Sequence, residues 1–157
     1  MVEPVKKRKG LFPELRKKGK IGEEKVDAFL KQNGYNILSL RFEAPCDECD
    51  KIQNWRKFTK LPEGIARKDN EVFFYESKFK TEEKFYVNVR DYNLYLKFSE
   101  ILPVKIFFYV EKTNSIFVHD VASLAYPEKF MYHDKNRVYD LKNYVKKLTL
   151  NNQAKLF

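Results

Sequence analysis

The chain has 157 residues, of which 43% are hydrophobic and 34% charged, and its formal net charge is +9. This length suits one compact domain with one core, and no apolar stretch is long enough to cross a bilayer or to serve as a secretion signal. We therefore expect a cytoplasmic protein whose basic surface is suited to binding a phosphate backbone.

Residues 1–20 form a basic arm in which only Glu3 and Glu14 oppose the positive charge. The basic residues of this arm are Lys6, Lys7, Arg8, Lys9, Arg16, Lys17, Lys18 and Lys20. Because the arm lacks apolar periodicity, we expect it to stay mobile until it lies along DNA phosphates, which makes DNA affinity depend steeply on salt. A solubilising tail is the alternative interpretation.

The next segment, residues 22–33, has the spacing of an amphipathic helix, with Val26, Phe29 and Leu30 on one face. Gly34 is suited to end this helix, since glycine accepts a left-handed backbone without penalty, and residues 35–40 follow as a strand. Glu23 falls on the apolar stripe of the helix. An acidic residue in a first turn is also favoured by the helix dipole, so this position has a structural explanation as well.

Residues 41–62 form a long polar connection, and long connections are often functional. It contains one Cys-x-x-Cys pair, Cys46 and Cys49. Zinc normally takes four ligands, and both histidines are distant in sequence, so a zinc site, free thiols and a disulfide remain alternatives. Trp55 with the adjacent Arg56 and Lys57 could contact a base or a phosphate, although a lone tryptophan is more often a packing anchor.

The apolar run Val72–Tyr75 predicts a buried strand that ends at Glu76-Ser77-Lys78. Side chains alternate along a strand, so Glu76 and Lys78 project from the same face. Residues 63–78 fit a hairpin whose polar turn is at Lys68-Asp69-Asn70, with Glu63 on the approach to the run.

Glu63 and Glu76 are candidate ligands for Mg²⁺, which prefers hard oxygen ligands and is held by one or two carboxylates plus a substrate phosphate. Lys78 could then position the nucleophile or neutralise charge that develops in the transition state. A Glu-x-Lys triplet is nevertheless common in a highly charged chain, where it usually belongs to a solvated strand face.

The second half of the chain predicts a helix over 89–100 and two strands over 104–110 and 115–119. His119-Asp120 could be an acid/base pair, but a structural histidine is the preferred interpretation. After residue 125 the pattern predicts a short strand around 137–139 and a helix over 141–148, and it indicates no chemistry there.

Four of these segments together resemble the PD-(D/E)xK nuclease superfamily, and within it the Holliday-junction-resolvase-like members. They are Gly22-Glu23, Gly34-Tyr35, Pro62-Glu63 and Glu76-Ser77-Lys78, and the similarity covers roughly residues 19–124. The resemblance implies Glu63 and Glu76 as ligands of Mg²⁺ or Mn²⁺, Lys78 as the catalytic lysine and Glu23 as an accessory acid. It also implies a polar or basic residue from the following helix, for which Arg90 and Asn93 are candidates.

One position departs from that family's pattern. The first acidic position is usually Asp, and here it is Glu63. A longer side chain moves the ligand, and about an ångström of misplacement can reduce a rate on the order of 100-fold. Asp47 and Asp50 could substitute if their loop folds over the site, but Glu63 is the first choice.

We therefore expect an α/β fold, in which a mixed central β-sheet is flanked by helices in a restriction-endonuclease-like core. The expected organisation is a basic arm (1–20), a nuclease core (21–125) and a C-terminal extension packed on it (126–157), with the acids at an edge where the second and third strands diverge. The expected function is metal-dependent cleavage of DNA by an endonuclease or exonuclease, with Holliday junctions or other branched DNA as candidate substrates. A junction resolvase would need a symmetric homodimer. The alternative is a non-catalytic nucleic-acid-binding or scaffold protein that keeps the fold.

Overall fold

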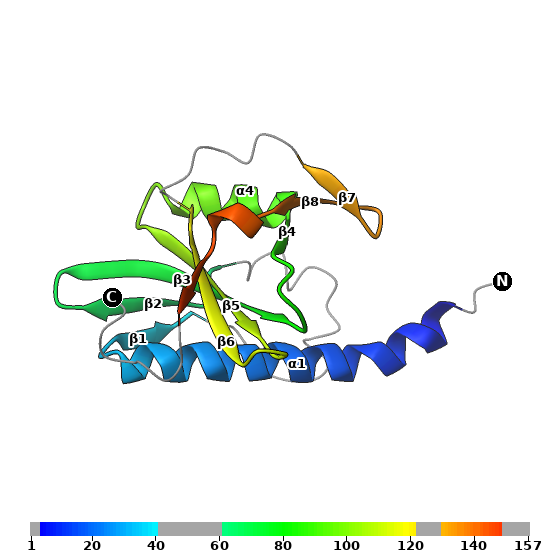
Figure 1. Cartoon of the computed structure of the whole chain (residues 1–157), viewed down its shortest axis with the longest axis horizontal. Coiled ribbons are helices and arrows are strands. Elements are labelled where there is room, and N and C mark those ends of the chain that lie inside the picture. Colours follow the sequence, from blue (N-terminus) through cyan, green and yellow to red (C-terminus); the bar gives the residue numbers. More distant parts are fainter. Residues whose placement is uncertain (1–3, 41–60, 122–129, 149–157) are drawn as a thin grey trace.

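The computed structural model describes residues 4–40, 61–121 and 130–148, with side chains described from residue 14 onward. A six-stranded sheet with the order β1-β2-β3-β5-β6-β9 forms its centre, and a three-stranded sheet with the order β4-β8-β7 lies beside it. Helix α1 covers one face of the large sheet, and α4 lies on the other (Figure 1). The α/β class with a mixed sheet between helices is thereby confirmed.

Helix α1 runs without interruption from Pro4 to Gln32. Its N-terminal half extends past the end of the sheet (Figure 1). The backbone of residues 4–20, expected as an arm, is therefore helical, and the mobility of the arm before DNA binding stays a prediction. The physical reason is that Lys, Arg, Leu and Glu, which dominate this segment, are all good helix formers, so a helix that is anchored at its apolar C-terminal half propagates backwards through them.

The end of α1 is as the sequence predicts. Gly34 has a φ of 87°, in the left-handed region. The amide of Tyr35 donates to the carbonyl of Leu30 at 3.0 Å, and the amide of Gly34 donates to the carbonyl of Lys31, also at 3.0 Å. These bonds form a Schellman motif that satisfies the last carbonyls of the helix and turns the chain into β1 (Asn36–Ser39).

Strands β2 (Gly64–Lys68) and β3 (Glu71–Lys80) form the predicted hairpin. Lys68 pairs with Glu71 across the turn, and Asp69 takes the left-handed conformation there with a φ of 53°. Strand β3 is the longest strand and pairs on its other side with β5 (Val104–Val110) in parallel. The predicted strand over 115–119 is also present, as β6 (Ser115–Asp120), antiparallel to β5.

The two faces of β3 belong to two separate packing clusters. Phe73 and Tyr75 pack with Val26, Phe29 and Leu30 of α1 in the first cluster. The second cluster, on the opposite face, joins Phe74 of β3 to β5 and to α4 (Val89–Phe98), the helix predicted for 89–100. Alternation along the strand therefore sends Ser77 toward α1, and Glu76 and Lys78 toward α4.

The predicted helix over 141–148 is wrong. Residues Lys142–Tyr144 form one 3-10 turn, and Lys146–Leu148 form strand β9, which pairs with β6. Leu141 is buried in the α4 cluster and Leu148 in the α1 cluster, which lie on opposite faces of the sheet. A helix would place both leucines on one face, whereas an extended segment carries the chain across the edge of β6 and buries each leucine on its own side.

Strands β4 (Tyr86–Asn88), β8 (Asn136–Asp140) and β7 (Met131–His133) make the small sheet. The predicted strand around 137–139 corresponds to β8. Among the described residues, no helix is long and apolar enough to cross a membrane.

Candidate active site

Glu63 lies immediately before β2, where the ladder with β3 ends. The last paired residues are Gly64 and Tyr75, and one further step in the same register sets Glu63 opposite Glu76. Side chains directly opposite on antiparallel strands have Cβ atoms about 4.5–5.5 Å apart. The register of the hairpin therefore brings together the two acids that the sequence singled out.

Gly64 allows this approach because it has no side chain. A Cβ atom at this position would lie 2.6 Å from Cε1 of Tyr75 and 2.7 Å from the carbonyl oxygen of Leu38. Real Cβ atoms do not come so close to a neighbouring backbone, so a larger residue would push the start of β2, and Glu63 with it, away from β3.

The carboxyl group of Glu76 is packed among protein atoms on the α4 side of the sheet. Burial raises its pKa well above the ordinary value, and the adjacent Glu63 carboxyl raises it further. The Lys78 ammonium opposes these effects, and a hydrogen bond between the two carboxyl groups again favours the protonated form of Glu76. Such a pair has more negative charge than its surroundings neutralise.

Ser77 holds Glu63 from the other face of β3. Its hydroxyl donates a hydrogen bond to Oε2 of Glu63. Consecutive residues of β3 thus contact the same glutamate from opposite sides of the strand, with Glu76 meeting it on one side and Ser77 on the other. This arrangement fixes where the Glu63 carboxyl group lies.

Helix α4 supplies two further groups, Tyr95 and Asp91. Burial raises the pKa of Tyr95, and the negative charges of Glu76 and Asp91 raise it further, so its hydroxyl stays protonated and donates to Glu76. The ammonium of Lys78 lies over the Tyr95 ring, 5.8 Å from its centroid. Tyr95 therefore contacts both the acid and the lysine of the Glu76-Ser77-Lys78 motif.

Lys80 continues the same face of β3 beyond Lys78. Its ammonium donates to the carbonyl of Tyr86 at 3.0 Å. Burial lowers the pKa of Lys80, and the neighbouring charge of Lys78 lowers it too. Two lysines thus follow Glu76 along one face of the strand and bring positive charge to the edge of the site.

The donor set fits a divalent cation held by two protein carboxylates. Among the residues that the structure describes, no group of three or more His, Cys, Asp or Glu side chains could hold a metal ion. Mg²⁺ does not need such a cage, because it usually keeps several waters and takes one or two carboxylates together with substrate phosphates. Burial is the largest cause of the raised pKa of Glu76, and the charge of Glu63 is the second; a cation between the two carboxyl groups would relieve that second contribution.

Glu23 is half-buried on α1, beside the far end of β3. The preceding residue, Gly22, packs so closely that a Cβ atom there would lie 3.2 Å from Cβ of Phe79. Phe79 faces α1, whereas Glu76 faces α4, and the charges that act on Glu76 are those of Glu63, Lys78 and Asp91. The role of Glu23 as an accessory acid stays a prediction.

For the other predicted site residues, the structure gives exposure or backbone position at most. Arg90 and Asn93 are exposed on α4, and Lys17, Lys18 and Lys20 are exposed on α1. Only the backbone is described for Lys6, Lys7, Arg8 and Lys9. Their part in DNA binding is untested. Cys46, Cys49, Asp47, Asp50 and the Trp55-Arg56-Lys57 segment lie outside the described residues.

His119 is fully buried in β6, as a structural histidine would be. Its Nδ1 lies 2.8 Å from the carbonyl of Tyr144, and its Nε2 lies 3.0 Å from the hydroxyl of Tyr92. A carbonyl can only accept, so Nδ1 carries the hydrogen and Nε2 accepts from Tyr92. Burial lowers the pKa of His119, so the ring is held neutral.

Sequence reasoning missed Ser77 as the partner of Glu63, and Asp91 and Tyr95 as neighbours of Glu76. Asp91 and Tyr95 are four residues apart, the spacing of one helix face, and this was the signal available. Interpreting that face required knowing that α4 packs over Glu76, which the helical pattern alone does not give.

Among solved structures, the chain is similar to the Holliday junction resolvase Hjc of Archaeoglobus fulgidus, an archaeal hyperthermophile. The TM-score is 0.56 and the sequence identity 15%, over 89% of this chain and 98% of that chain. At this identity the likeness shows the fold alone, a mixed β-sheet flanked by helices. No family model matches the chain, and no curated protein matches its sequence.

Proposed function

We propose that this protein is a deoxyribonuclease that hydrolyses phosphodiester bonds with Mg²⁺ or Mn²⁺, and that its substrates include Holliday junctions or other branched DNA. The observation that carries the proposal is the contact between the carboxyl groups of Glu63 and Glu76, with Lys78 on the same face of β3. The likeness in fold to a Holliday junction resolvase supports branched DNA as the substrate class.

In this proposal Glu63 and Glu76 hold the cation, and Lys78 neutralises charge that develops on the scissile phosphate. When bound, the cation supplies Lewis-acid chemistry, polarising the phosphate and lowering the pKa of a water molecule. Tyr95 donates to Glu76 and so fixes the direction of its lone pairs, while Ser77 does the same for Glu63. Glu23 is kept as an accessory acid.

DNA is the proposed partner, inside the cell, and the exposed lysines of α1 are proposed to lie along its backbone. Lys17, Lys18 and Lys20 are exposed on α1 and so are accessible to a phosphate chain. The N-terminal part of this helix extends beyond the sheet (Figure 1). A junction resolvase must cut two opposed strands, so activity on four-way junctions would require a symmetric dimer.

A second candidate function is DNA binding without turnover. It is favoured by the longer Glu63 side chain at a position usually occupied by Asp. It is also favoured by the lack, among the described residues, of a group of three or more His, Cys, Asp or Glu side chains that could hold a metal ion. Both candidates predict salt-dependent DNA binding, and they differ only in metal-dependent cleavage.

Cleavage assays separate the two candidates. Linear duplex, single-stranded and four-way-junction DNA are incubated with Mg²⁺ or Mn²⁺, and wild type is compared with Glu76→Gln and Lys78→Met. We expect each substitution to reduce cleavage at least about 100-fold, the effect of removing a group that stabilises transition-state charge. Glu100→Gln and Lys97→Met are matched controls that should leave cleavage unchanged, because Lys97 is exposed in the last turn of α4 and Glu100 is exposed just after the helix.

The enzyme proposal fails if, with either metal, wild type cleaves no substrate faster than Glu76→Gln and Lys78→Met do. In that case salt-dependent binding of the same DNA molecules would leave the non-catalytic candidate standing.

A further inference from the structure

The β7–β8 hairpin exposes large apolar side chains at its start. Phe130, Met131 and Tyr132 have 46%, 41% and 69% of their surface exposed. The rings of Phe130 and Tyr132 meet edge to face with centroids 5.7 Å apart, and the Arg137 guanidinium lies 5.5 Å from the Phe130 centroid. An aromatic pair with an arginine stacked beside it, left open to solvent, is a surface suited to a flat, negatively charged partner.

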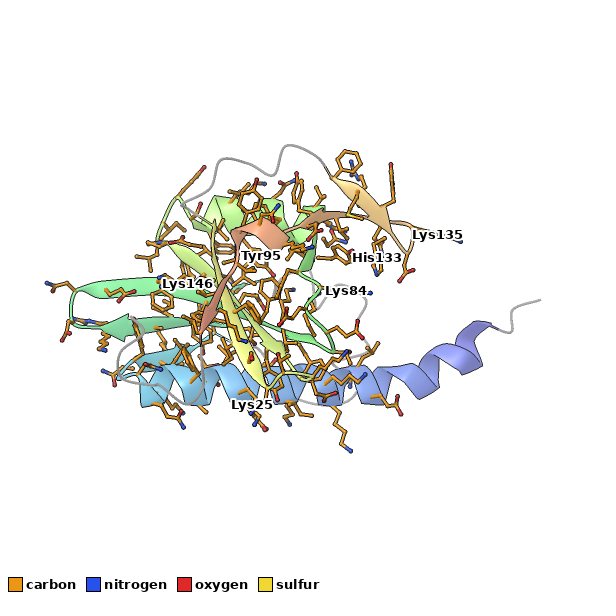
Figure 2. All side chains as sticks on the ribbon, in the orientation of Figure 1. Lys25, Lys84, Tyr95, His133, Lys135 and Lys146 are labelled. Atoms are coloured by element: carbon orange, nitrogen blue, oxygen red, sulfur yellow. The ribbon has the colours of Figure 1, made fainter. Side chains whose placement is uncertain are left out.

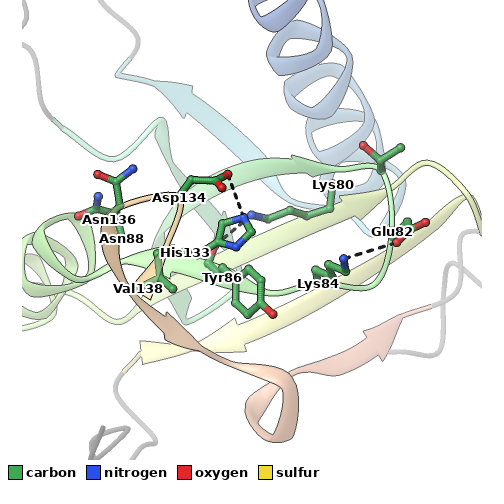
Figure 3. Close-up of a pocket in the computed structure, with 10 residues that line it drawn as sticks. Lys80, Glu82, Lys84, Tyr86, Asn88, His133, Asp134, Asn136 and Val138 are labelled. Carbon is green, nitrogen blue, oxygen red and sulfur yellow. Dashed lines mark hydrogen bonds and ion pairs between the residues drawn. The ribbon is translucent and has the colours of Figure 1, made fainter. Parts of the chain in front are cut away.

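Two hollows adjoin at this hairpin. The first, of about 500 Å³, lies between the end of β3 and the hairpin, and Lys80, Lys84 and His133 line it (Figure 3). The second, of about 370 Å³, lies between the hairpin and the start of α4. Asn88 and Asn136 line both hollows, so the two adjoin at these residues, and together they are called the groove below.

The second hollow is basic. Its described lining includes Arg90, Lys135 and Arg137 and contains no acidic residue. The first hollow is mixed, because Glu82 and Asp134 also line it. Glu82 lies 3.9 Å from the ammonium of Lys84, and Asp134 lies 3.4 Å from Nε2 of His133. His133 and Lys135 lie near the tip of the hairpin, and Lys84 lies below them in the segment before β4 (Figure 2).

The groove begins next to the proposed active site. Lys80 lies two residues after Lys78 on the same face of β3, and it lines the first hollow. Arg90, which lines the second hollow, is adjacent in α4 to Asp91, whose charge acts on Glu76. A strand whose phosphate lies at Glu76 can therefore continue along β3 into the groove.

We infer that this groove binds an unpaired segment of the DNA strand that continues from the scissile phosphate, with its backbone on Arg137 and Lys135 and a base stacked on Tyr132. The inference rests on the proposed function and narrows its substrate class to DNA with a single-stranded flank. Single strands expose base faces to aromatic side chains, whereas bases in a duplex are already stacked on each other.

A second aromatic pair supports the same occupant. The rings of Tyr86 and His133 have centroids 4.9 Å apart and line the first hollow. Aromatic rings interleaved with basic groups along a groove are the general pattern for binding a single strand without strict sequence preference. The net charge of +9 adds long-range attraction for the same partner.

The test measures binding without metal, so that cleavage does not enter. Fluorescence anisotropy of a labelled oligodeoxythymidylate, and of a blunt duplex of the same length, is followed in EDTA. We expect Tyr132→Ala to weaken single-strand binding about fivefold or more and duplex binding less. Arg137→Ala should weaken single-strand binding and reduce the slope of log K against log salt by about 0.7, the value for one lost phosphate contact on a single strand.

Matched controls are available elsewhere on the surface. Tyr144→Ala removes another exposed tyrosine, and Arg67→Ala removes an exposed arginine from β2, and neither residue lines the groove. Both should leave binding within a factor of two of wild type. Because Tyr132 and Arg137 are exposed, their variants should keep the wild-type circular dichroism and melting temperature.

The inference is overturned if Tyr132→Ala and Arg137→Ala bind the single strand as well as their controls do, or if both weaken duplex binding as much. These results are distinct from a failure of the proposed function. If wild type cleaves DNA and the groove variants bind the single strand normally, only the inference about the groove is rejected. If those variants bind the single strand more weakly but wild type cleaves nothing with either metal, only the nuclease proposal is rejected.

Discussion

The carboxyl groups of Glu63 and Glu76 lie against each other at the open end of the β2–β3 ladder, and the Glu63 carboxyl raises the pKa of Glu76 beyond the effect of burial. Glu63 arrives there because Gly64 permits close strand pairing, and Glu76 is held there by the longest strand of the sheet. The contact places unfavourable charge in the folded protein. It should therefore lower the free energy of unfolding, even where the same two carboxyl groups serve the proposed cleavage.

Neutralising Glu76 should stabilise the protein. Its pKa is raised in the folded state above the ordinary 4.5, so the folded protein binds a proton that the unfolded chain has released, and stability falls as pH rises between these two pKa values. Glu76→Gln removes this loss. We expect the melting temperature at pH 7 without metal to rise by about 2–4 °C, as for a gain of about 1 kcal/mol. Glu100→Gln, at an exposed site, should leave it unchanged, and an equal rise in both variants would contradict the explanation.

Divalent metal should stabilise wild type through the carboxylate pair. A ligand at ten times its dissociation constant stabilises the folded state by about 1.4 kcal/mol, which raises the melting temperature by about 3–5 °C. Differential scanning fluorimetry with increasing Mg²⁺ should show this rise in wild type and not in Glu63→Gln. A rise of the same size in the variant would mean that the metal binds elsewhere.

Removing the Tyr95 hydroxyl should reduce cleavage while the fold persists. Tyr95→Phe loses the donor to Glu76, and a hydrogen bond to a charged group contributes about 1.5–3 kcal/mol, so we expect cleavage to fall about tenfold or more. Tyr92→Phe is the control on the same helix, because the Tyr92 hydroxyl meets Nε2 of His119 at 3.0 Å. It should lower stability by about 1 kcal/mol and leave the cleavage rate of folded protein unchanged. Equal rates for the two variants would argue against a role for Tyr95.

Alanine at two glycines should have opposite effects. Gly64→Ala forces a Cβ atom against Tyr75 and the Leu38 carbonyl, and we expect a destabilisation of about 1–3 kcal/mol together with loss of cleavage. At Gly19 an added Cβ atom would have nothing within 4 Å, and the residue is inside α1, so Gly19→Ala should stabilise by roughly 0.5–1 kcal/mol. Chemical denaturation measures both, and a stable Gly64→Ala protein that cleaves normally would show that β2 can shift.

Acidification should destabilise the protein through His119. Its pKa is lowered in the folded state, chiefly by burial, so below the ordinary value of 6.5 the unfolded chain binds a proton more readily than the folded protein does. This contribution is fully present above pH 6.5 and is lost as pH falls through the lowered pKa. His119→Gln should be less stable at pH 7 but should lose less stability between pH 7 and 5. Parallel pH profiles for the two proteins would contradict this assignment.

Local sequence patterns predicted the elements whose conformation depends only on residues close together in the chain. The Gly34 cap, the hairpin at Asp69 and the strand that carries Glu76 follow from backbone preference and alternation. The C-terminal segment did not follow, because Leu141 and Leu148 have helical spacing but are buried on opposite faces of a sheet whose β6 edge is open to pairing. Tyr95 was also missed, since its partner Glu76 is near only after α4 has packed on β3.

Glu63 is held by neighbours that belong to different halves of the interior, since Ser77 points toward the layer beneath α1 and Glu76 toward the layer beneath α4. Loosening either layer would tilt one of these neighbours and not the other. Cavity-forming substitutions far from the edge, such as Phe29→Ala on one side or Tyr139→Ala on the other, would thus misalign the acids before the molecule unfolds. The rate of the proposed cleavage would then fall in response to packing defects in either layer, before the protein unfolds.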